Sequence, residues 1–266
     1  MAESKLNRRQ LVAAVGGVLG GGVAGVLIAS DETPRSPAPP AAAEAKPAAP
    51  AVPWTYHPLD PDATAERAFA GFQKGRCMFG VFESIVGPLG ETYGDPYRSF
   101  PVAMMKYGHG GVNGWGSLCG ALNGAAAAFQ LLSPDPNPLI DETLSWCDRE
   151  ALPDYVGRAA KFANVPSVSG SPLCHVSISR WCRKSGKKAY SPERDERCAS
   201  LTASVARHAV TLLNRQAGGA KTGSILPAET VECQSCHEKG GVVENARSKM
   251  TCPQCHFHLG KEHPGA

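Results

Sequence analysis

Apolar residues recur at helical spacing along much of the chain. After Asp60-Pro61 the pattern continues to Gly75, which predicts a capped amphipathic helix. It resumes from Cys77 to Val86, and Gly87-Pro88 is predicted to end that helix. The same spacing predicts helices over residues 119–132, 138–152, 154–163 and 192–215. Strand signals are scarce, so the sequence predicts a mainly α fold.

The longest predicted helix has its own start and stop signals. Ser191 is a favoured N-cap residue, Pro192 takes the first helical position, and Gly218 follows the end. Its apolar face comprises Cys198, Leu201, Thr202, Val205, Ala209 and Leu212.

A glycine-dense loop, Gly-His-Gly-Gly-Val-Asn-Gly-Trp-Gly, runs from Gly108 to Gly116. A dinucleotide-binding fingerprint would lie between a strand and a helix, and this loop lacks that setting. We therefore expect no phosphate site here. The loop instead predicts a backbone packed closely against a cofactor or a neighbouring segment.

The N-terminus reads as a targeting signal. Arg8-Arg9 directly precedes a weakly apolar run from Leu11 to Ala29, the pattern of a twin-arginine export signal. A signal anchor is the alternative, because the run is nearly long enough to span a membrane and basic flanks also orient such anchors. The sequence therefore predicts a periplasmic protein, with possible membrane anchoring through residues 11–29.

These patterns divide the chain into four parts. An export signal or anchor at 1–30 is followed by a Pro/Ala-rich linker at 31–53, whose composition is typical of an extended spacer. A helical cysteine-containing domain at 54–218 precedes a short, loop-rich segment at 219–266.

Composition narrows the function mainly through cysteine. The 27 Lys+Arg against 24 Asp+Glu give a formal charge of +3, which does not indicate a nucleic-acid partner. Collagen, coiled coil and wholesale disorder are excluded. Ten cysteines in 266 residues are too few for a disulfide-stapled miniprotein and too many for an ordinary cytosolic enzyme.

Four of these cysteines form two complete C-x-x-C-H motifs, Cys233–His237 and Cys252–His256. The paired cysteines, Cys233 with Cys236 and Cys252 with Cys255, can form thioethers with a haem. The adjacent histidine then becomes the proximal iron ligand. The sequence therefore predicts two covalently bound haems c, held close together by the short spacing between the motifs.

Fifteen residues separate Cys236 from Cys252, so the same cysteines also fit a zinc ribbon. Zinc does not require a histidine after both pairs, and export places the cysteines where haem is attached, so haem is favoured. Two redox C-x-x-C pairs would need a thioredoxin-like βαβ context, which the sequence lacks.

Six further cysteines lie in the helical domain: Cys77, Cys119, Cys147, Cys174, Cys182 and Cys198. In an exported protein they can form disulfides or remain buried thiols. An iron–sulfur cluster is the alternative. The twin-arginine route carries folded proteins, so this signal favours a cofactor inserted before export.

The cysteine pattern resembles a known family. Gly75-Arg76-Cys77, Cys119–Ala125, Cys174 and Arg197-Cys198 resemble the scattered cysteines of the C-GCAxxG-C-C family. The glycine loop, Cys174–Ser177 with Trp181-Cys182, and the terminal motifs resemble split-Soret cytochromes c more closely. The likeness extends from about Ala65 to the end.

This resemblance implies a mostly helical subunit with two haems c, a homodimer that gathers four haems at one end, and an iron–sulfur site in the helical domain. It implies cluster ligands at Cys77, Cys119, Cys174 and Cys198, with Cys182 as the alternate. The chain departs from the family pattern because Gly-Ala follows Cys119, and because two cysteines exceed the four of the pattern.

If each haem takes two histidines, the distal ligands come from His57, His109, His175, His208, His258 and His263. His109 in the glycine loop and His175 beside Cys174 are the leading candidates, and His258 is next. With both axial positions filled, the protein is an electron carrier whose redox partner proteins are unknown. An open position would permit reduction of a small oxidised substrate, but no separate catalytic constellation is present.

Overall fold

The computed structural model describes residues 50–223 and 226–256. The chain divides into two units, residues 1–47 and 48–266, and the described residues belong to the second. The predicted export signal, its apolar run at 11–29 and nearly all of the linker lie outside the described residues. In the two described ranges no helix is long and apolar enough to cross a membrane.

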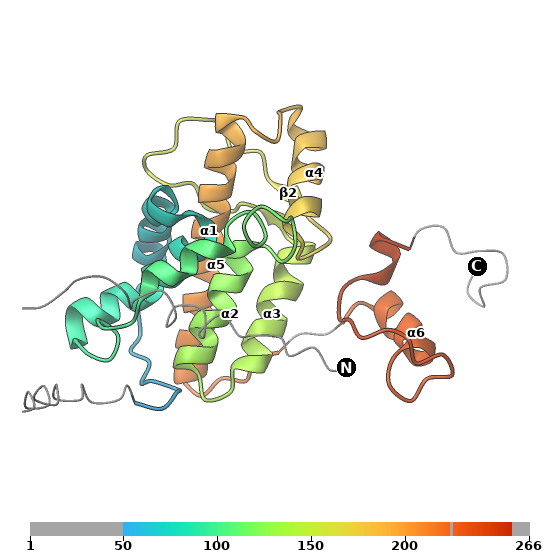
Figure 1. Ribbon diagram of the computed structural model, residues 1–266, viewed down its shortest axis with the longest axis horizontal. Helices are drawn as coiled ribbons and strands as arrows, with labels where there is room; N and C mark the ends of the chain where they lie inside the picture. The colour runs from blue at the N-terminus through green and yellow to red at the C-terminus, as the bar shows by residue number, and fades with distance from the viewer. Residues whose placement is uncertain (1–49, 224–225, 257–266) are drawn as a thin grey trace, which may run out of the picture. The chain divides into compact units, whose positions relative to one another are not determined.

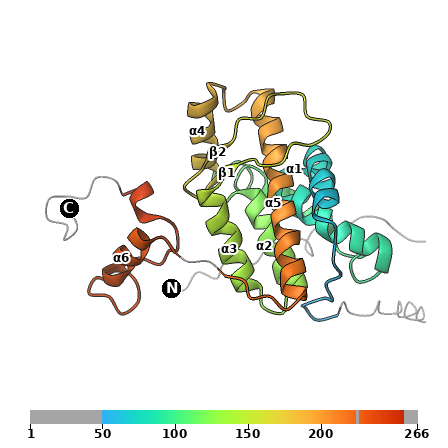
Figure 2. The same ribbon diagram turned by 180° about the vertical axis from the view of Figure 1, so that it is seen from behind.

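The body is mainly α, as predicted. Its helices are α1 (Pro61–Tyr93), α2 (Gly120–Leu132), α3 (Pro136–Arg149), α4 (Cys174–Ser185) and α5 (Pro192–Ala217), with a 3-10 helix η1 (Val102–Gly108). Helices α2, α3 and α5 run side by side in both views (Figures 1 and 2). The strands β1 (Ala151–Leu152) and β2 (Ser167–Val168) form a short antiparallel pair.

Helix α1 differs from its prediction in where it ends. Asp60 caps it by accepting hydrogen bonds from the backbone of Asp62 and Ala63, at 2.8 and 2.9 Å. The two helices expected here form one element, kinked at Arg76, which has the left-handed φ of 67°. The predicted stop at Gly87-Pro88 is wrong, because the buried side chain of Leu89 packs in the core and holds the helix beyond the proline.

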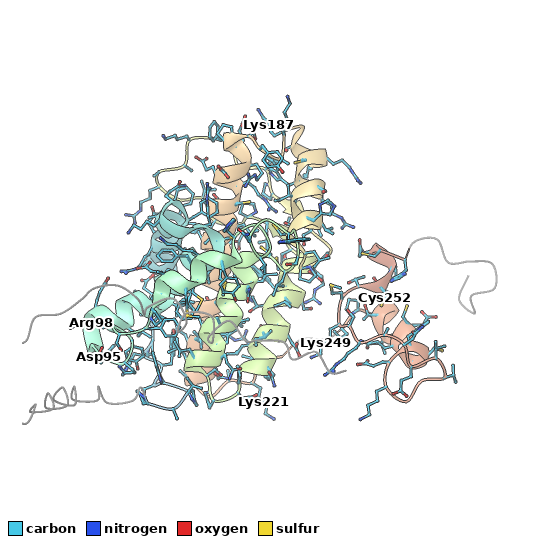
Figure 3. All side chains as sticks on the ribbon, viewed as in Figure 1. Asp95, Arg98, Lys187, Lys221, Lys249 and Cys252 are labelled. Carbon is cyan, nitrogen blue, oxygen red and sulfur yellow. The ribbon has the colours of Figure 1, made fainter. Side chains whose placement is uncertain are left out.

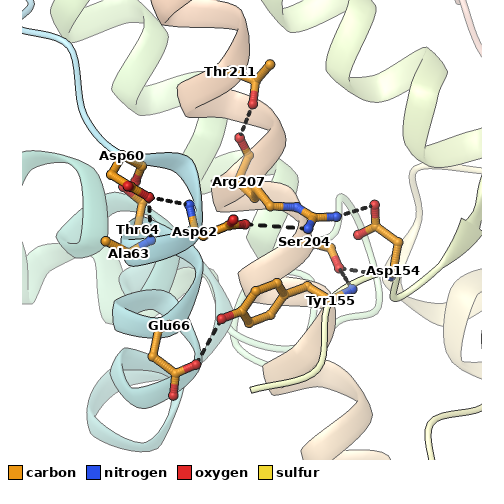
Figure 4. A network of polar contacts seen from close by, with 10 residues as sticks. All are labelled: Asp60, Asp62, Ala63, Thr64, Glu66, Asp154, Tyr155, Ser204, Arg207 and Thr211. Carbon is orange, nitrogen blue, oxygen red and sulfur yellow. Dashed lines mark hydrogen bonds and ion pairs between the residues drawn. The ribbon is translucent and has the colours of Figure 1, made fainter. Parts of the chain in front are cut away.

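The predicted helix over residues 154–163 is also wrong. Five of its backbone amides donate to side chains of other elements and make no helical hydrogen bonds. Ser204 accepts from the amides of Asp154 and Tyr155, both at 3.1 Å, while Tyr155 donates to Glu66 at 2.9 Å (Figure 4). These hydrogen bonds hold residues 154–163 against α1 and α5 as a loop and not as a helix.

Helix α5 confirms its predicted signals and packs closely on α1. The Ser191 hydroxyl accepts from the amide of Arg194 at 3.2 Å, and Gly218 caps the end. At the crossing of the two helices, a Cβ on Gly80 would lie 2.8 Å from Thr202 Cγ2, so only glycine permits this approach. The resulting core fixes the parts of the two helices that carry cysteines.

The C-terminal segment contains α6 (Ala228–His237) and the 3-10 helix η2 (Cys252–Gln254). Among its described residues only Thr230 is buried. Several apolar side chains are exposed, including Val231 at 53 % and Val242 at 92 %. The described part of this segment therefore has no hydrophobic core of its own.

Candidate functional site

Four body cysteines come from four different helices. Cys77 follows the kink of α1, Cys119 is the N-cap of α2, Cys174 opens α4, and Cys198 lies in the second turn of α5. Neighbouring thiols contribute to the raised pKa values of Cys77, Cys119 and Cys174, and at Cys174 each of the other three cysteines contributes. The fold thus brings together the four cysteines that were predicted as a ligand set.

Two glycines allow this approach. A Cβ on Gly120 would lie 2.5 Å from Cys77 Sγ and 2.2 Å from the carbonyl oxygen of Gly108. A Cβ on Gly108 would overlap Met78, beside Cys77. The first turn of α2 and the end of η1 therefore contact the α1 cysteine only because these positions lack side chains.

The glycine loop has the packing role that its sequence predicts. Left-handed φ values at Gly110, Gly111, Val112, Asn113, Gly114 and Gly116 turn it back on itself. The carbonyl of Gly116 then accepts from the amide of His175 at 3.0 Å, and that of Ser117 from Cys174 at 2.8 Å. The loop therefore joins the start of α4 to the turn that carries Cys119.

Burial raises the pKa values of three of these thiols. It raises the pKa of Cys77 to about 12, and neighbouring thiols add to the effect. The pKa values of Cys119 and Cys174 are also raised, chiefly by burial. Thiol–disulfide exchange requires accessible thiolates, so this arrangement does not suit exchange chemistry. The described cysteines are all unpaired, so no disulfide joins them.

Arg197, which directly precedes Cys198, is a buried cation near the cysteines. Arg197 is 5 % exposed, its Nη2 donates to Ser177 Oγ at 2.9 Å, and its Nε has no partner. No carboxylate of the described chain forms an ion pair with it. Burial raises the pKa values of Cys119, Cys147 and Cys174, and the charge of Arg197 acts in the opposite direction.

An unpaired buried cation is costly unless an anion compensates it. Arg197 and Trp181 are also among the residues that line a hollow of about 10 Å³, which has room for about one water molecule. A water can satisfy Nε–H, but it cannot neutralise the charge. Deprotonated cysteines would do so.

The two remaining body cysteines occupy different surroundings. Cys147 is buried on α3, and the electrostatic effects on its pKa include that of Cys119. Cys182 lies eight residues after Cys174 on α4, about 12 Å along the helix axis. The structure therefore places Cys147 within electrostatic reach of Cys119, a proximity that the sequence did not indicate.

Among the described residues, no three His, Cys, Asp or Glu side chains are arranged to hold a single metal ion. A multinuclear cluster spaces its cysteines more widely than a single ion does, because bridging sulfides separate the irons. The soft thiol donors and the adjacent cation fit such a cluster chemically.

In the C-terminal segment the two C-x-x-C-H motifs lie beside each other. The pKa of Cys252 on η2 is raised, chiefly by burial, and Cys233 on α6 adds to the effect. His237 Nδ1 lies 2.7 Å from the side-chain Oδ1 of Asn245, and when Nδ1–H donates to this acceptor, Nε2 carries the lone pair. This tautomer suits an iron ligand.

The same four cysteines are the ligands of the alternative zinc ribbon. A ribbon gathers four cysteines around one point. Cys233, Cys236, Cys252 and Cys255 are all described, and no three of them are so arranged.

The candidate distal histidines differ in their surroundings. The ring of His57 stacks on Tyr93 at 3.7 Å, and that of His208 on Trp146 at 4.0 Å. His109 and His175 instead lie at the glycine loop, with His175 exposed. His258 and His263 lie outside the described residues.

The fold and its thiols define a class, a helical cysteine-rich redox protein. The family model described as "Putative redox-active protein (C_GCAxxG_C_C)" matches residues 79–212. Split-Soret cytochrome c from Desulfovibrio desulfuricans is 37% identical over 263 residues, covering 94% of each chain. A solved structure of that cytochrome, described as containing "a novel iron centre", matches with a TM-score of 0.73 at 37% identity and covers 76% of this chain and 90% of that one.

The chain belongs to the split-Soret cytochrome c family. The resemblance stated from the sequence is therefore confirmed. The family span begins two residues after Cys77 and ends before the C-x-x-C-H motifs.

Proposed function

We propose that this chain is an exported electron-transfer protein with two haems c and an iron–sulfur centre. The haems are attached through Cys233 and Cys236, and through Cys252 and Cys255, with His237 and His256 as proximal ligands. The observation that carries the proposal is the pair of adjacent C-x-x-C-H motifs in a segment without a core. Two large flat apolar groups would cover its exposed valines.

The iron–sulfur centre is assigned to Cys77, Cys119, Cys174 and Cys198. Arg197 supports this part of the proposal, because its buried charge needs an anionic neighbour. Cys182 remains the alternate that the sequence suggests, although Cys147 lies nearer to the set. The name of the D. desulfuricans relative and the iron centre described for its structure are consistent with both cofactors.

His109 and His175 are the proposed distal ligands, with His258 next, and a homodimer would bring haems of two subunits together. When both axial positions are filled, iron exchanges electrons without binding substrate. A reductase of a small oxidised molecule is the second candidate function, and it requires one open iron. Export by the twin-arginine route to the periplasm, cleaved or anchored, completes the proposal.

The test is a count of cofactors in protein purified anaerobically from its native host. We expect two haems per chain in a pyridine haemochrome assay, additional non-haem iron, and no zinc. Cys233→Ser/Cys236→Ser should retain one haem. One haem in the wild-type protein would overturn the haem assignment, and a Mössbauer spectrum with haem iron alone would overturn the cluster.

Axial ligation distinguishes the two functions. A carrier with filled axial positions should not bind carbon monoxide when reduced, whereas a reductase should. His109→Ala should convert one low-spin haem to high spin, and His57→Phe, in the body but away from the glycine loop, should not. An unchanged spectrum in His109→Ala would remove that residue from the ligand set.

A further inference from the structure

Positive charge is concentrated at one end of the body. Loop 186–191 joins α4 to α5, and with the end of α4 it forms a surface that we call the basic tip. Its exposed side chains are Arg183, Lys184, Lys187, Lys188 and Tyr190. Figure 3 shows Lys187 at this end of the body, remote from Arg98 and Lys221. The tyrosine is 95 % exposed.

The nearby acidic groups do not neutralise the basic tip. Residues 180–197 contain seven basic and three acidic side chains. Lys187 pairs with Glu193 at 2.9 Å, and Arg194 with Asp195 at 2.9 Å.

The third acid, Glu196, accepts the backbone amides of Lys161 and Phe162, both at 2.7 Å. Arg183, Lys184 and Lys188 form no ion pair within the described ranges. These cations therefore project a positive field into solvent from a chain whose formal charge is only +3.

The basic tip lies close to the proposed centre. Cys174 opens the helix whose end carries Lys184, ten residues and about 15 Å further along the axis. Cys198 lies seven residues, about 10 Å, after the N-cap Ser191. The buried Trp181 lies between Cys174 and Lys184 on α4. Because electron transfer weakens steeply with distance, this end is a short route between the centre and a docked molecule.

We propose that the basic tip is the docking surface for an electron-transfer protein with an acidic surface around its own cofactor. This inference rests on the proposed redox function. Complementary charge steers such partners into fast, transient encounters. An exposed tyrosine surrounded by cations supplies the amphipathic contact that is enriched at protein interfaces.

An anionic membrane would also attract these cations, but the observations favour a protein. Interfacial membrane binding through apolar contact uses a helix that lies flat, with a broad apolar face. The basic tip instead consists of a helix end and a loop, with a single exposed aromatic side chain. Membrane binding is consequently an outcome of the test that would contradict the proposal.

The experiment uses full-length holoprotein and an acidic plant-type [2Fe–2S] ferredoxin as the probe. Stopped-flow absorbance measures the second-order rate of electron transfer from low to high ionic strength. Arg183→Glu/Lys184→Glu is compared with Arg98→Glu/Lys221→Glu, which changes the net charge equally at the other end. We expect the tip variant to react about tenfold more slowly at low salt and to lose most of its salt dependence, while the control keeps both.

Equal rates in the wild-type protein and the tip variant, or equal losses in the two variants, would overturn the docking surface. So would tip-dependent binding to phosphatidylserine vesicles with an unchanged ferredoxin rate. Oxidation of the reduced protein by ferricyanide is followed in parallel. Protein that cannot be reduced and reoxidised would contradict the redox function itself, whereas intact redox cycling with no effect of the tip variant contradicts the docking surface alone.

Discussion

The buried histidine of α5 makes stability depend on pH. The His208 ring stacks on Trp146 with centroids 4.0 Å apart and planes 3° apart, and its Nε2 is buried without a hydrogen-bond partner. Burial lowers its pKa from 6.5 to about 4, against smaller opposing effects of Glu142 and Asp154. The folded protein therefore keeps this ring neutral at pH values at which the unfolded chain protonates it.

The sign and size of the effect follow from linkage. Because the folded pKa is depressed, the stabilisation is complete above pH 6.5 and is lost as the pH falls towards 4. Each pKa unit corresponds to about 1.4 kcal/mol, so the full shift amounts to about 3 kcal/mol. Residual solvent exposure of the ring reduces this to about 2–3 kcal/mol.

His208→Phe tests this reasoning, because it keeps a flat ring against Trp146 and removes the titration. Urea unfolding of the holoprotein, followed by circular dichroism at pH 7.5 and 4.5, gives the free energy of unfolding. We expect the wild-type protein to lose about 2 kcal/mol more than the variant over this interval. His57→Phe should behave like the wild-type protein. Parallel losses in the wild-type protein and His208→Phe would show that the ring is not held neutral.

Three further predictions concern the body. Gly120→Ala would place a Cβ 2.5 Å from Cys77 Sγ. We expect this variant to lose about 1–3 kcal/mol of stability in thermal unfolding and to bind less non-haem iron. Gly218→Ala is the control, because its Cβ would meet only ordinary contacts, and it should change neither quantity. Burial raises the pKa of Asp148 to about 6, so protonation favours folding and this stabilisation is lost as the pH rises through 6. Asp148→Asn should therefore be more stable than the wild-type protein at pH 8, by about 1–2 kcal/mol after allowance for solvent screening, with a smaller difference at pH 4 in urea unfolding. Arg197→Met should lower the reduction potential of the body centre in a redox titration, and Arg197→Lys should lower it less; equal potentials in all three proteins would refute the role of the buried charge.

Local signals predicted the parts of the fold that are determined locally. Asp60 and Ser191 cap helices as their sequences indicate, because an N-cap acts on amides two or three residues away. The helix end predicted at Pro88 was wrong, because the packing of distant helices around Leu89 outweighs the backbone hydrogen bond that proline cannot donate. The loop after Pro153 was mistaken for a helix for a similar reason, since its amides bind side chains that are remote in sequence.

The candidate site shows the same limit. The C-x-x-C-H motifs are contiguous, so their spacing alone identifies a chemistry. The body cysteines lie far apart in sequence, and only the resemblance selected four of the six. Nothing local distinguished Cys147 from Cys182, because proximity to Cys119 depends on how α3 packs. Arg197 gave no sign of its burial, since arginine is usually exposed.

The single buried side chain in the described C-terminal segment has an evolutionary consequence. A part of a protein that lacks a core places few packing demands on its sequence, so most substitutions there are neutral for folding. If the proposed haems are bound, the demands on its sequence fall chiefly on the residues that attach and ligate them. The helical body is constrained at many more positions, and the family span of residues 79–212 ends within it. Such a segment can be gained, lost or duplicated while the body that it follows stays intact.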